Sequence, residues 1–266
     1  MQAPHAGLIH MEGHYTSRVA IQHFPTSLVE SWLPDAIELA PQAISPSGYH
    51  PVNLLFGIQS KVYFNINPLF KFKYQEFGLV VPYVQWKDPK YQYNSPFLFT
   101  PIIFVDNFLV SLGGEIVFGF PKRMAKFQVN DSHYAASDPE VNTPYVGVQY
   151  EKLSSTPDPV ALTSIRDCLQ QPSISQKRNG KFSESGFWWN LDTAEFNDLK
   201  LDGEIINYML PGVRSGNTQK VAAEGTANFS DGAAFEMRTD WTLTLPTSDF
   251  NKDWAPWNGT SGGGTK

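Results

Sequence analysis

The sequence predicts a mostly β protein of the α+β class, in which a largely antiparallel sheet closes or packs on itself. Extended apolar segments recur along the chain, helix signals are few, and twenty glycines and twenty prolines separate the segments. The helices are too few for repeated strand–helix–strand units, which disfavours a parallel sheet between helical layers. The length of 266 residues suits one large domain, which we assign to residues 1–250.

The expected strands are rich in β-branched and aromatic residues, and the last of them also alternates between apolar and polar side chains. They cover residues 52–58, 61–66, 78–86, 97–104, 108–112, 115–120, 145–150, 199–209 and 233–245. Residues 97–120 form the most apolar stretch. Pro101, Asp106 and paired glycines interrupt it, so adjacent core strands are favoured over a membrane helix, which needs roughly 20 largely uninterrupted apolar residues.

Two segments carry helix signals. A short helix is expected after Thr26 or Ser27, either of which is a candidate N-cap, and Pro34 ends it. A second helix is expected from about residue 159 to 170, where apolar residues recur at helical spacing after the candidate cap Asp158. We therefore expect a few short helices beside the sheet.

Composition and charge exclude several classes of partner. Hydrophobic residues make up 41% of the chain and charged residues 17%, which favours an ordered, well-packed protein. The formal charge of −6 and the absence of a basic cluster disfavour nucleic acid, because phosphate binding needs clustered lysine and arginine. The scattered histidines, including His10 and His14 on either side of Glu12, suggest no metal site.

The ends of the chain and its cysteine content indicate the compartment. Cys168 is the single cysteine, so no intrachain disulfide is possible. The first residues lack the basic stretch and apolar run of a signal peptide, and we expect a cytoplasmic protein without a membrane partner. Residues 251–266 read as a polar, glycine-rich C-terminal tail.

Residues 113–126 carry the clearest chemical signal. An apolar segment delivers Lys122 just after a proline, and Arg123 follows it. Burial among Phe118, Phe120 and Met124 would disfavour the ammonium form, and a nearby cation would act in the same direction. A lysine with a lowered pKa attacks a ketone to form an imine, which is an electron sink for breaking or forming carbon–carbon bonds.

The other interpretation of this segment is a strand that ends in solvated cations, as such residues commonly do. Neighbouring side chains on an extended chain point to opposite faces, so Arg123 is expected to face away from Lys122 unless Pro121 breaks the alternation. The role of Arg123 therefore stays open between keeping Lys122 neutral and binding an anionic group. Desolvation is expected to affect the pKa of Lys122 more than Arg123 does.

With these residues in place, the chain resembles the acetoacetate decarboxylase superfamily. Residues 113–123 are similar to its glycine–arginine–glutamate signature followed by a short strand and an aromatic–proline–lysine–lysine run, and residues 74–78 are similar to its aromatic–x–glutamate–x–glycine strand opening. The resemblance covers roughly residues 20–130. It implies a β-barrel-like fold, a homo-oligomer, an imine at Lys122 and an active-site glutamate at Glu76, with no metal or organic cofactor.

Several positions depart from the family pattern. Arg123 replaces the second lysine, and Glu115 lies one residue further from Lys122 than the family's glutamate. The family's early arginine falls near Tyr15, with Arg18 as the closest substitute for binding a substrate carboxylate. A further family glutamate falls near Leu55. The loss of carboxylate-binding and acidic groups argues against acetoacetate itself, and we expect the imine chemistry to serve a different substrate or a different reaction.

The sequence thus supports a carbon–carbon lyase that acts on a keto acid or related carbonyl compound, with decarboxylation as the first reaction to consider. An aldolase or dehydratase of the same superfamily is the second hypothesis, and a non-catalytic β-barrel that binds a small molecule is the third. Aromatic residues are expected to line a large apolar substrate pocket. The candidates in the strand region are Tyr63, Phe64, Phe70, Phe72 and Tyr74.

Overall fold

The computed structural model describes residues 10–88, 96–140, 142, 144–176, 182–205, 227–229 and 233–244. Its strands are β1 (His10–Pro25), β2 (Ile37–Leu39), β3 (Tyr49–Phe64), β4 (Asn67–Trp86), β5 (Phe97–Val105), β6 (Lys122–Met124), β7 (Lys126–Val129), β8 (His133–Ser137), β9 (Pro144–Lys152), β10 (Ser173–Gln176), β11 (Phe182–Trp189), β12 (Glu195–Ile205), β13 (Ala227–Phe229) and β14 (Ala234–Thr244). Its helices are α1 (Thr26–Glu30), α2 (Phe108–Gly113), the π-helix η1 (Gly114–Phe118) and α3 (Pro159–Leu169).

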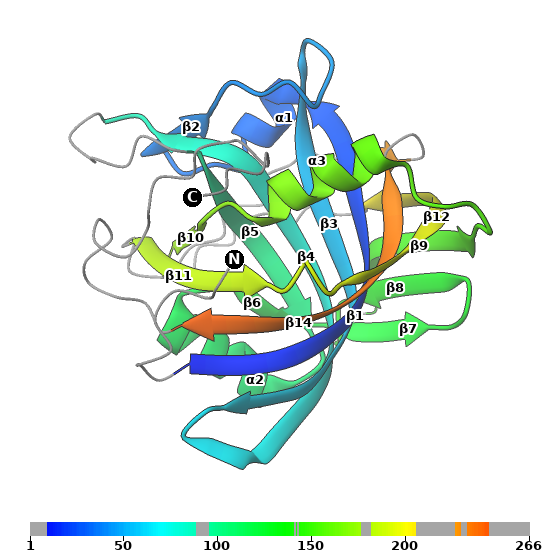
Figure 1. The fold of residues 1–266 in the computed structure, drawn as a ribbon. Coiled ribbons are helices and arrows are strands. Elements are labelled where there is room, and N and C mark those ends of the chain that lie inside the picture. Colours follow the sequence, from blue (N-terminus) through cyan, green and yellow to red (C-terminus); the bar gives the residue numbers. More distant parts are fainter. Residues whose placement is uncertain are drawn as a thin grey trace, which may run out of the picture.

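The strands form one sheet that closes on itself, as Figure 1 shows. The order β1-β3-β4-β5-β10-β11-β14 returns to β1, because β14 pairs with β1 from Ala20–Ala234 to His10–Thr244. Beyond β14 the sheet continues through β12, β9, β8 and β7 and curls around the outside. Most pairs are antiparallel, whereas β5 pairs in parallel with β10 and β6. The predicted mostly β, barrel-like architecture is confirmed.

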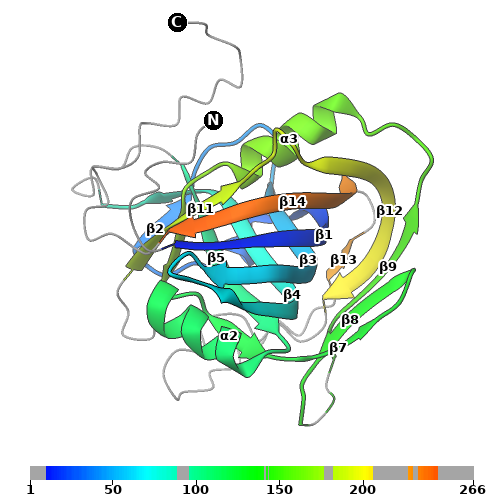
Figure 2. The same ribbon diagram turned by 60° about the horizontal axis from the view of Figure 1, so that its bottom comes forward.

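The two faces of the β1–β3–β4–β5 layer bury separate cores. Alternate side chains on a strand point to opposite faces, so Leu55 and Phe56 belong to different cores. The inner face packs with α3 around the barrel interior, whereas the outer face packs against β8, β9 and β12. Figure 2 shows α3 on one side of the barrel and α2 on the opposite side.

Both predicted helices are present. α1 begins at Thr26, but the prediction of Thr26 or Ser27 as its cap is wrong, because Pro25 occupies the N-cap position and no side chain caps the helix. The helix also ends at Glu30, before Pro34. α3 begins after Asp158, whose carboxylate accepts a hydrogen bond from the Val160 amide at 3.1 Å. The prediction of Asp158 as a cap is confirmed.

Residues 108–112 and 115–120 were predicted as strands, and this prediction is wrong. They form α2 and η1, because Asn107 caps the helix by accepting a hydrogen bond from the Val110 amide at 3.1 Å. Gly119, at a φ of 74°, ends the helix in a left-handed conformation that favours glycine. A short apolar run has no periodicity that distinguishes a strand from a helix, which explains the error.

Some expectations fall on residues outside the described part of the chain. The glycine-rich tail at 251–266 and the end of the strand expected at 199–209 are among them. Within the described residues, no helix is long and apolar enough to cross a membrane.

Candidate active site

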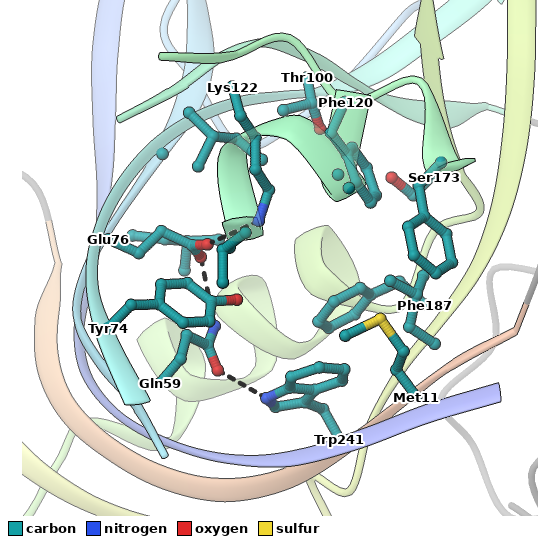
Figure 3. Close-up of a pocket in the computed structure, with 18 of the residues that line it drawn as sticks. Met11, Gln59, Tyr74, Glu76, Thr100, Phe120, Lys122, Ser173, Phe187 and Trp241 are labelled. Atoms are coloured by element: carbon teal, nitrogen blue, oxygen red, sulfur yellow. Dashed lines mark hydrogen bonds and ion pairs between the residues drawn. The ribbon is translucent and has the colours of Figure 1, made fainter. Parts of the chain in front are cut away.

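Lys122 enters the barrel from the short strand β6. The chain leaves η1 at Gly119, passes Pro121 and then runs parallel to β5, with Lys122 in register with Ile103. The Lys122 amide donates to the Phe120 carbonyl at 2.8 Å, and the Ile103 amide donates to the Pro121 carbonyl at 3.1 Å. These bonds direct the Lys122 side chain into the cavity shown in Figure 3.

The cavity has a volume of about 140 Å³ and a mostly apolar lining. Aromatic side chains contribute much of that lining, among them Phe64, Phe72, Phe118, Phe120, Phe187 and Trp189. Its polar side chains are Gln59, Tyr74, Glu76, Thr100, Lys122 and Ser173. An apolar cleft with a few convergent polar groups is the usual form of a small-molecule site.

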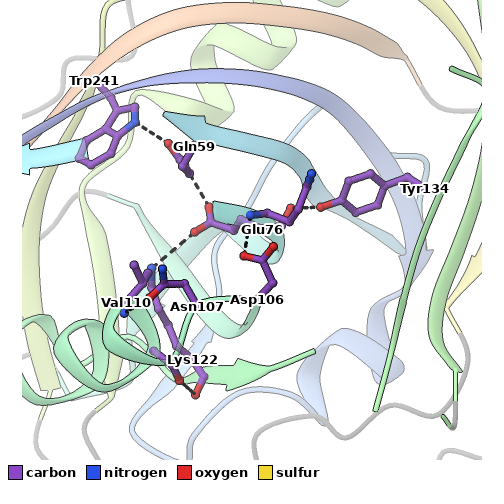
Figure 4. Close-up of polar contacts among 10 residues, drawn as sticks. Gln59, Glu76, Asp106, Asn107, Val110, Lys122, Tyr134 and Trp241 are labelled. Atoms are coloured by element: carbon purple, nitrogen blue, oxygen red, sulfur yellow. Dashed lines mark hydrogen bonds and ion pairs between the residues drawn. The ribbon is translucent and has the colours of Figure 1, made fainter. Parts of the chain in front are cut away.

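Three of these polar side chains, those of Lys122, Glu76 and Gln59, form a connected chain with Trp241 across the cavity wall, drawn in Figure 4. Lys122 Nζ lies 3.5 Å from Glu76 Oε2. Gln59 Nε2 donates to Glu76 Oε1 at 3.2 Å, and Trp241 Nε1 donates to Gln59 Oε1 at 2.6 Å. Residues from β3, β4, β6 and β14 are thereby joined at one point in the barrel.

The position of Glu76 is fixed from the outer side of the sheet as well. Tyr134 on β8 donates its hydroxyl to the Glu76 carbonyl at 2.7 Å. The Gln75 amide donates to the Asp106 carboxylate at 2.9 Å. Backbone bonds to β3 and β5 hold the remaining edges of this part of β4. The Glu76 carboxylate therefore extends from a rigid strand.

Burial governs the ionisation of Lys122. Its side chain is 8% exposed, and desolvation lowers the pKa of the amine below its ordinary value of 10.5. Glu76 opposes this shift through its charge and its hydrogen bond. The Tyr74 ring centroid lies 5.2 Å from Nζ, within the range of a cation–π contact. Lys122 is thus a buried amine and not a solvated cation at the end of a strand.

The helix α2–η1 forms the wall next to the lysine. Gly114 faces the Lys122 side chain so closely that an ideal Cβ at this position would lie 2.6 Å from Lys122 Cδ. A larger residue at position 114 would therefore displace the lysine side chain. Glu115 lies one residue further from Lys122 than in the family pattern. The π-helix η1 accounts for this residue, because a π turn contains one residue more than an α-helical turn. Single π turns also occur frequently at functional sites.

The structure brings several of the predicted residues together. Lys122, Glu76, Phe118 and Phe120 all line the cavity, and the rings of the two phenylalanines stack with centroids 6.2 Å apart. Met124 is half-buried and packs against the same inner core, but it is not among the described residues that line the cavity.

Arg123 lies on the other side of the strand from Lys122. It is in register with Phe104, a residue of the outer core, and its charge acts on Tyr145, whose pKa it lowers against the larger effect of burial. The strand alternation at β6 therefore survives Pro121. The structure does not bring Arg123 into the cavity.

The two β1 candidates take different faces. Arg18 is in register with Phe56 of the outer core, and its guanidinium lies 4.3 Å from the centre of the Tyr150 ring. Tyr15 is in register with Gln59 and is fully buried in the inner core, where its ring stacks on Trp189. Tyr15 thus lies behind the cavity wall, whereas Arg18 is separated from the cavity by the sheet.

Of the five aromatic residues considered in the strand region 63–74, three line the cavity, namely Phe64, Phe72 and Tyr74. Tyr63 instead donates a hydrogen bond to Glu12, and Phe70 is 59% exposed. Sequence reasoning assigned no role to Gln59, Gly114 or Trp241. Gln59 and Trp241 meet through strand pairings between distant segments, and Gly114 lies in a helix that was predicted as a strand.

Comparison with solved structures identifies the fold. No protein-family model matches the chain, and no curated protein matches its sequence. The enduracididine biosynthesis enzyme MppR, complexed with pyruvate, superimposes with a TM-score of 0.58 at 12% identity, over 92% of this chain and 90% of that chain. A second MppR structure holds the condensation product of pyruvate and imidazole 4-carboxaldehyde.

Two further structures carry the name of the superfamily. An acetoacetate decarboxylase-like enzyme from Sphingomonas wittichii matches with a TM-score of 0.57 at 9% identity, over 90% of this chain and 92% of that chain. Acetoacetate decarboxylase from Legionella pneumophila matches with a TM-score of 0.51 at 15% identity, over 93% and 89% of the two chains. The chain therefore has the acetoacetate decarboxylase-like fold, which it shares with these enzymes.

Proposed function

We propose that this chain is a carbon–carbon lyase in which Lys122 forms an imine with a carbonyl substrate. The observation that supports this proposal is a buried amine of lowered pKa in an apolar cavity, beside a carboxylate at 3.5 Å. The neutral amine attacks the carbonyl carbon, and water leaves as the imine forms. Glu76 is the group that accepts or returns protons at Nζ and at the substrate.

The protonated imine then accepts an electron pair from a bond to the neighbouring carbon. In a β-keto acid this is the bond to the carboxylate, so carbon dioxide leaves and an enamine remains on Lys122. Protonation of the enamine carbon and addition of water release the ketone product and the free amine. Decarboxylation of a keto acid with an apolar body is the reaction that the sequence resemblance favours.

An aldol-type reaction is the second candidate, and the position of Glu76 favours it. A carboxylate so close to the imine repels a substrate carboxylate, but it is well placed to move a proton to or from a substrate hydroxyl or carbon. The condensation product bound to MppR is consistent with such chemistry on this fold. In this reaction an enamine carbon attacks an aldehyde, and loss of water gives the unsaturated product.

The test is borohydride trapping with separate keto acids, β-diketones and aldehydes, read by peptide mass spectrometry. Hydride reduction of the imine should fix the substrate skeleton on Lys122, and Lys122→Ala should show no adduct. An adduct on another lysine, or none with any carbonyl compound, would contradict the proposal. Carbon dioxide release, measured without borohydride for the keto acids that form adducts, separates decarboxylation from the aldol-type reaction.

A further inference from the structure

A chain of buried hydrogen bonds leads from Trp241 to the lysine. The indole is solely a donor, so its bond to Gln59 Oε1 at 2.6 Å fixes which end of the amide faces Glu76. The Gln59 amide nitrogen must then donate to Glu76 Oε1, as it does at 3.2 Å. This leaves Oε2 of the same carboxylate facing Lys122 Nζ.

The indole itself is held from both sides. Trp241 pairs with Gly13 across the β14–β1 ladder, and an ideal Cβ on Gly13 would lie 2.4 Å from Trp241 Cζ2. Phe187 stacks on the other side with ring centroids 5.2 Å apart. Trp241 is 4% exposed, so its ring is buried between these two contacts. A glycine on β1 thus determines where the indole donor points.

The carboxylate and the ammonium do not reach full contact. Charge-assisted hydrogen bonds from nitrogen to a carboxylate are usually about 2.7–2.9 Å long, whereas Glu76 Oε2 and Lys122 Nζ are 3.5 Å apart. Gln59 draws the opposite oxygen of the carboxylate toward β3. We propose that Trp241 and Gln59 are positioning residues that hold Glu76 back from Lys122, so that the lysine is oriented but incompletely paired.

This inference rests on the proposed function, because an incompletely paired lysine gives up its proton more readily than one in a full ion pair. Among the described residues, the titratable groups on which Glu76 acts besides Lys122 are Tyr74 on β4, Tyr15 on β1 and Tyr134 on β8. The carboxylate of Asp106, just after β5, also acts on Tyr74 and Tyr134. The pKa of each tyrosine is raised by burial and by the charge of Glu76, so all three are neutral near pH 7. Glu76 is therefore the charge that sets the ionisation of Lys122 against its burial.

The test measures the pKa of Lys122 without any substrate, by NMR titration of protein labelled with ¹³C at lysine Cε, with Lys122→Arg to assign the signal. In Trp241→Phe and in Gln59→Met the carboxylate is released and closes on the ammonium. The pKa of Lys122 should then rise by about one unit, which leaves roughly tenfold less neutral amine below that pKa. Gly13→Ala should produce the same direction of shift, because it displaces the indole.

Trp32→Phe is the matched control, since Trp32 is a buried tryptophan of the outer core and should leave the Lys122 titration unchanged. Circular dichroism identifies any variant that does not fold. The three substitutions lie on different strands, so the pKa of Lys122 can be compared with the wild type in each variant that folds. An unchanged pKa of Lys122 in the folded variants would overturn the inference. Because the titration needs no imine, this result is independent of whether borohydride trapping supports the proposed function.

Discussion

The side chain of Lys122 lies directly across Gly114, with no room between them for a methyl group. The contact is between the helix α2–η1, which the sequence analysis did not predict, and Lys122, which it identified most clearly. It also shows why the lysine is buried: the helix α2–η1 covers it on one side while β4 and β5 cover the other. The neighbouring glycine has no such constraint, because an ideal Cβ on Gly113 meets nothing within 4 Å.

Gly114→Ala should impair imine formation by displacing the lysine. The new methyl group would lie 2.6 Å from Lys122 Cδ and 2.8 Å from Cε, so the amine must move. A misplacement of about 1 Å in a reacting group costs on the order of 100-fold in rate, and we expect borohydride trapping to slow by about 10- to 100-fold.

Gly113→Ala provides the matched control for this experiment. Gly113 has helical backbone angles, so alanine should stabilise the helix by roughly 0.5–1 kcal/mol. Gly113 also lines the cavity, but the new methyl group meets no atom within 4 Å. Imine trapping of a small carbonyl compound should therefore remain at the wild-type rate, and thermal unfolding should reveal the added stability. Equal losses of trapping in the two variants would show that the helix, and not the contact with Lys122, is responsible.

Removal of the Glu76 charge should make Lys122 easier to deprotonate. Glu76 raises the pKa of Lys122 against the effect of burial, so Glu76→Gln should lower that pKa further, by about one unit. Initial rates of imine trapping measured across pH should therefore shift toward lower pH. Turnover should fall by about 10²–10⁴-fold, because the general acid–base group is lost. A shift toward higher pH would contradict the assigned electrostatics.

Arg123→Met should leave the pH dependence of Lys122 unchanged. A nearby cation lowers the pKa of a lysine, so loss of a contributing arginine would raise it. Arg123 instead lies beside the outer core with Phe104, on the opposite side of β6. Titration of Lys122 in this variant distinguishes an Arg123 beside the outer core from an Arg123 close to Lys122. A clear rise in the pKa of Lys122 would show that the arginine charge acts on it.

The residues of the site differ in how far the sequence could reveal them. Lys122 and Glu76 stand in short local motifs beside apolar strand residues, so local chemistry and family resemblance were sufficient to find them. Gln59 and Trp241 stand 182 positions apart and meet through the pairings of β1 with β3 and β14. The role of such a pair depends on strand register, which a single sequence does not determine.

The fold was predictable to a similar extent. The abundance of β-forming residues predicted the barrel-like fold. The strand β1 was not predicted, even though its buried side chains alternate through Tyr15, Ser17 and Val19. The polar residues between them concealed an apolar face of a long strand. The helix α2–η1 was assigned to strands, because the cap at Asn107 is a local signal that the apolar stretch around it outweighed.

The pair of Lys122 and Glu76 should reduce the stability of the protein. Each single removal leaves one charge unpaired in an apolar cavity, so Lys122→Met and Glu76→Gln should each destabilise the fold, by about 3–5 kcal/mol where the remaining charge stays fully buried. The double variant Lys122→Met/Glu76→Gln removes both charges while it keeps the volume and the hydrogen bond from Gln59. We expect it to be as stable as the wild type or up to about 4 kcal/mol more stable.

The difference in stability between the double variant and the wild type should depend on pH, in a direction set by the Lys122 pKa shift. The folded-state pKa lies below the ordinary value of 10.5, so between these two values the unfolded chain binds a proton that the folded protein lacks. Raising the pH through this window therefore stabilises the wild type, and the double variant cannot gain in this way. Its advantage in urea unfolding should be largest near neutral pH and should shrink toward about pH 10. An advantage that grows with pH would mean that the pKa of Lys122 is raised in the folded protein, and it would remove the basis for a reactive lysine at this position.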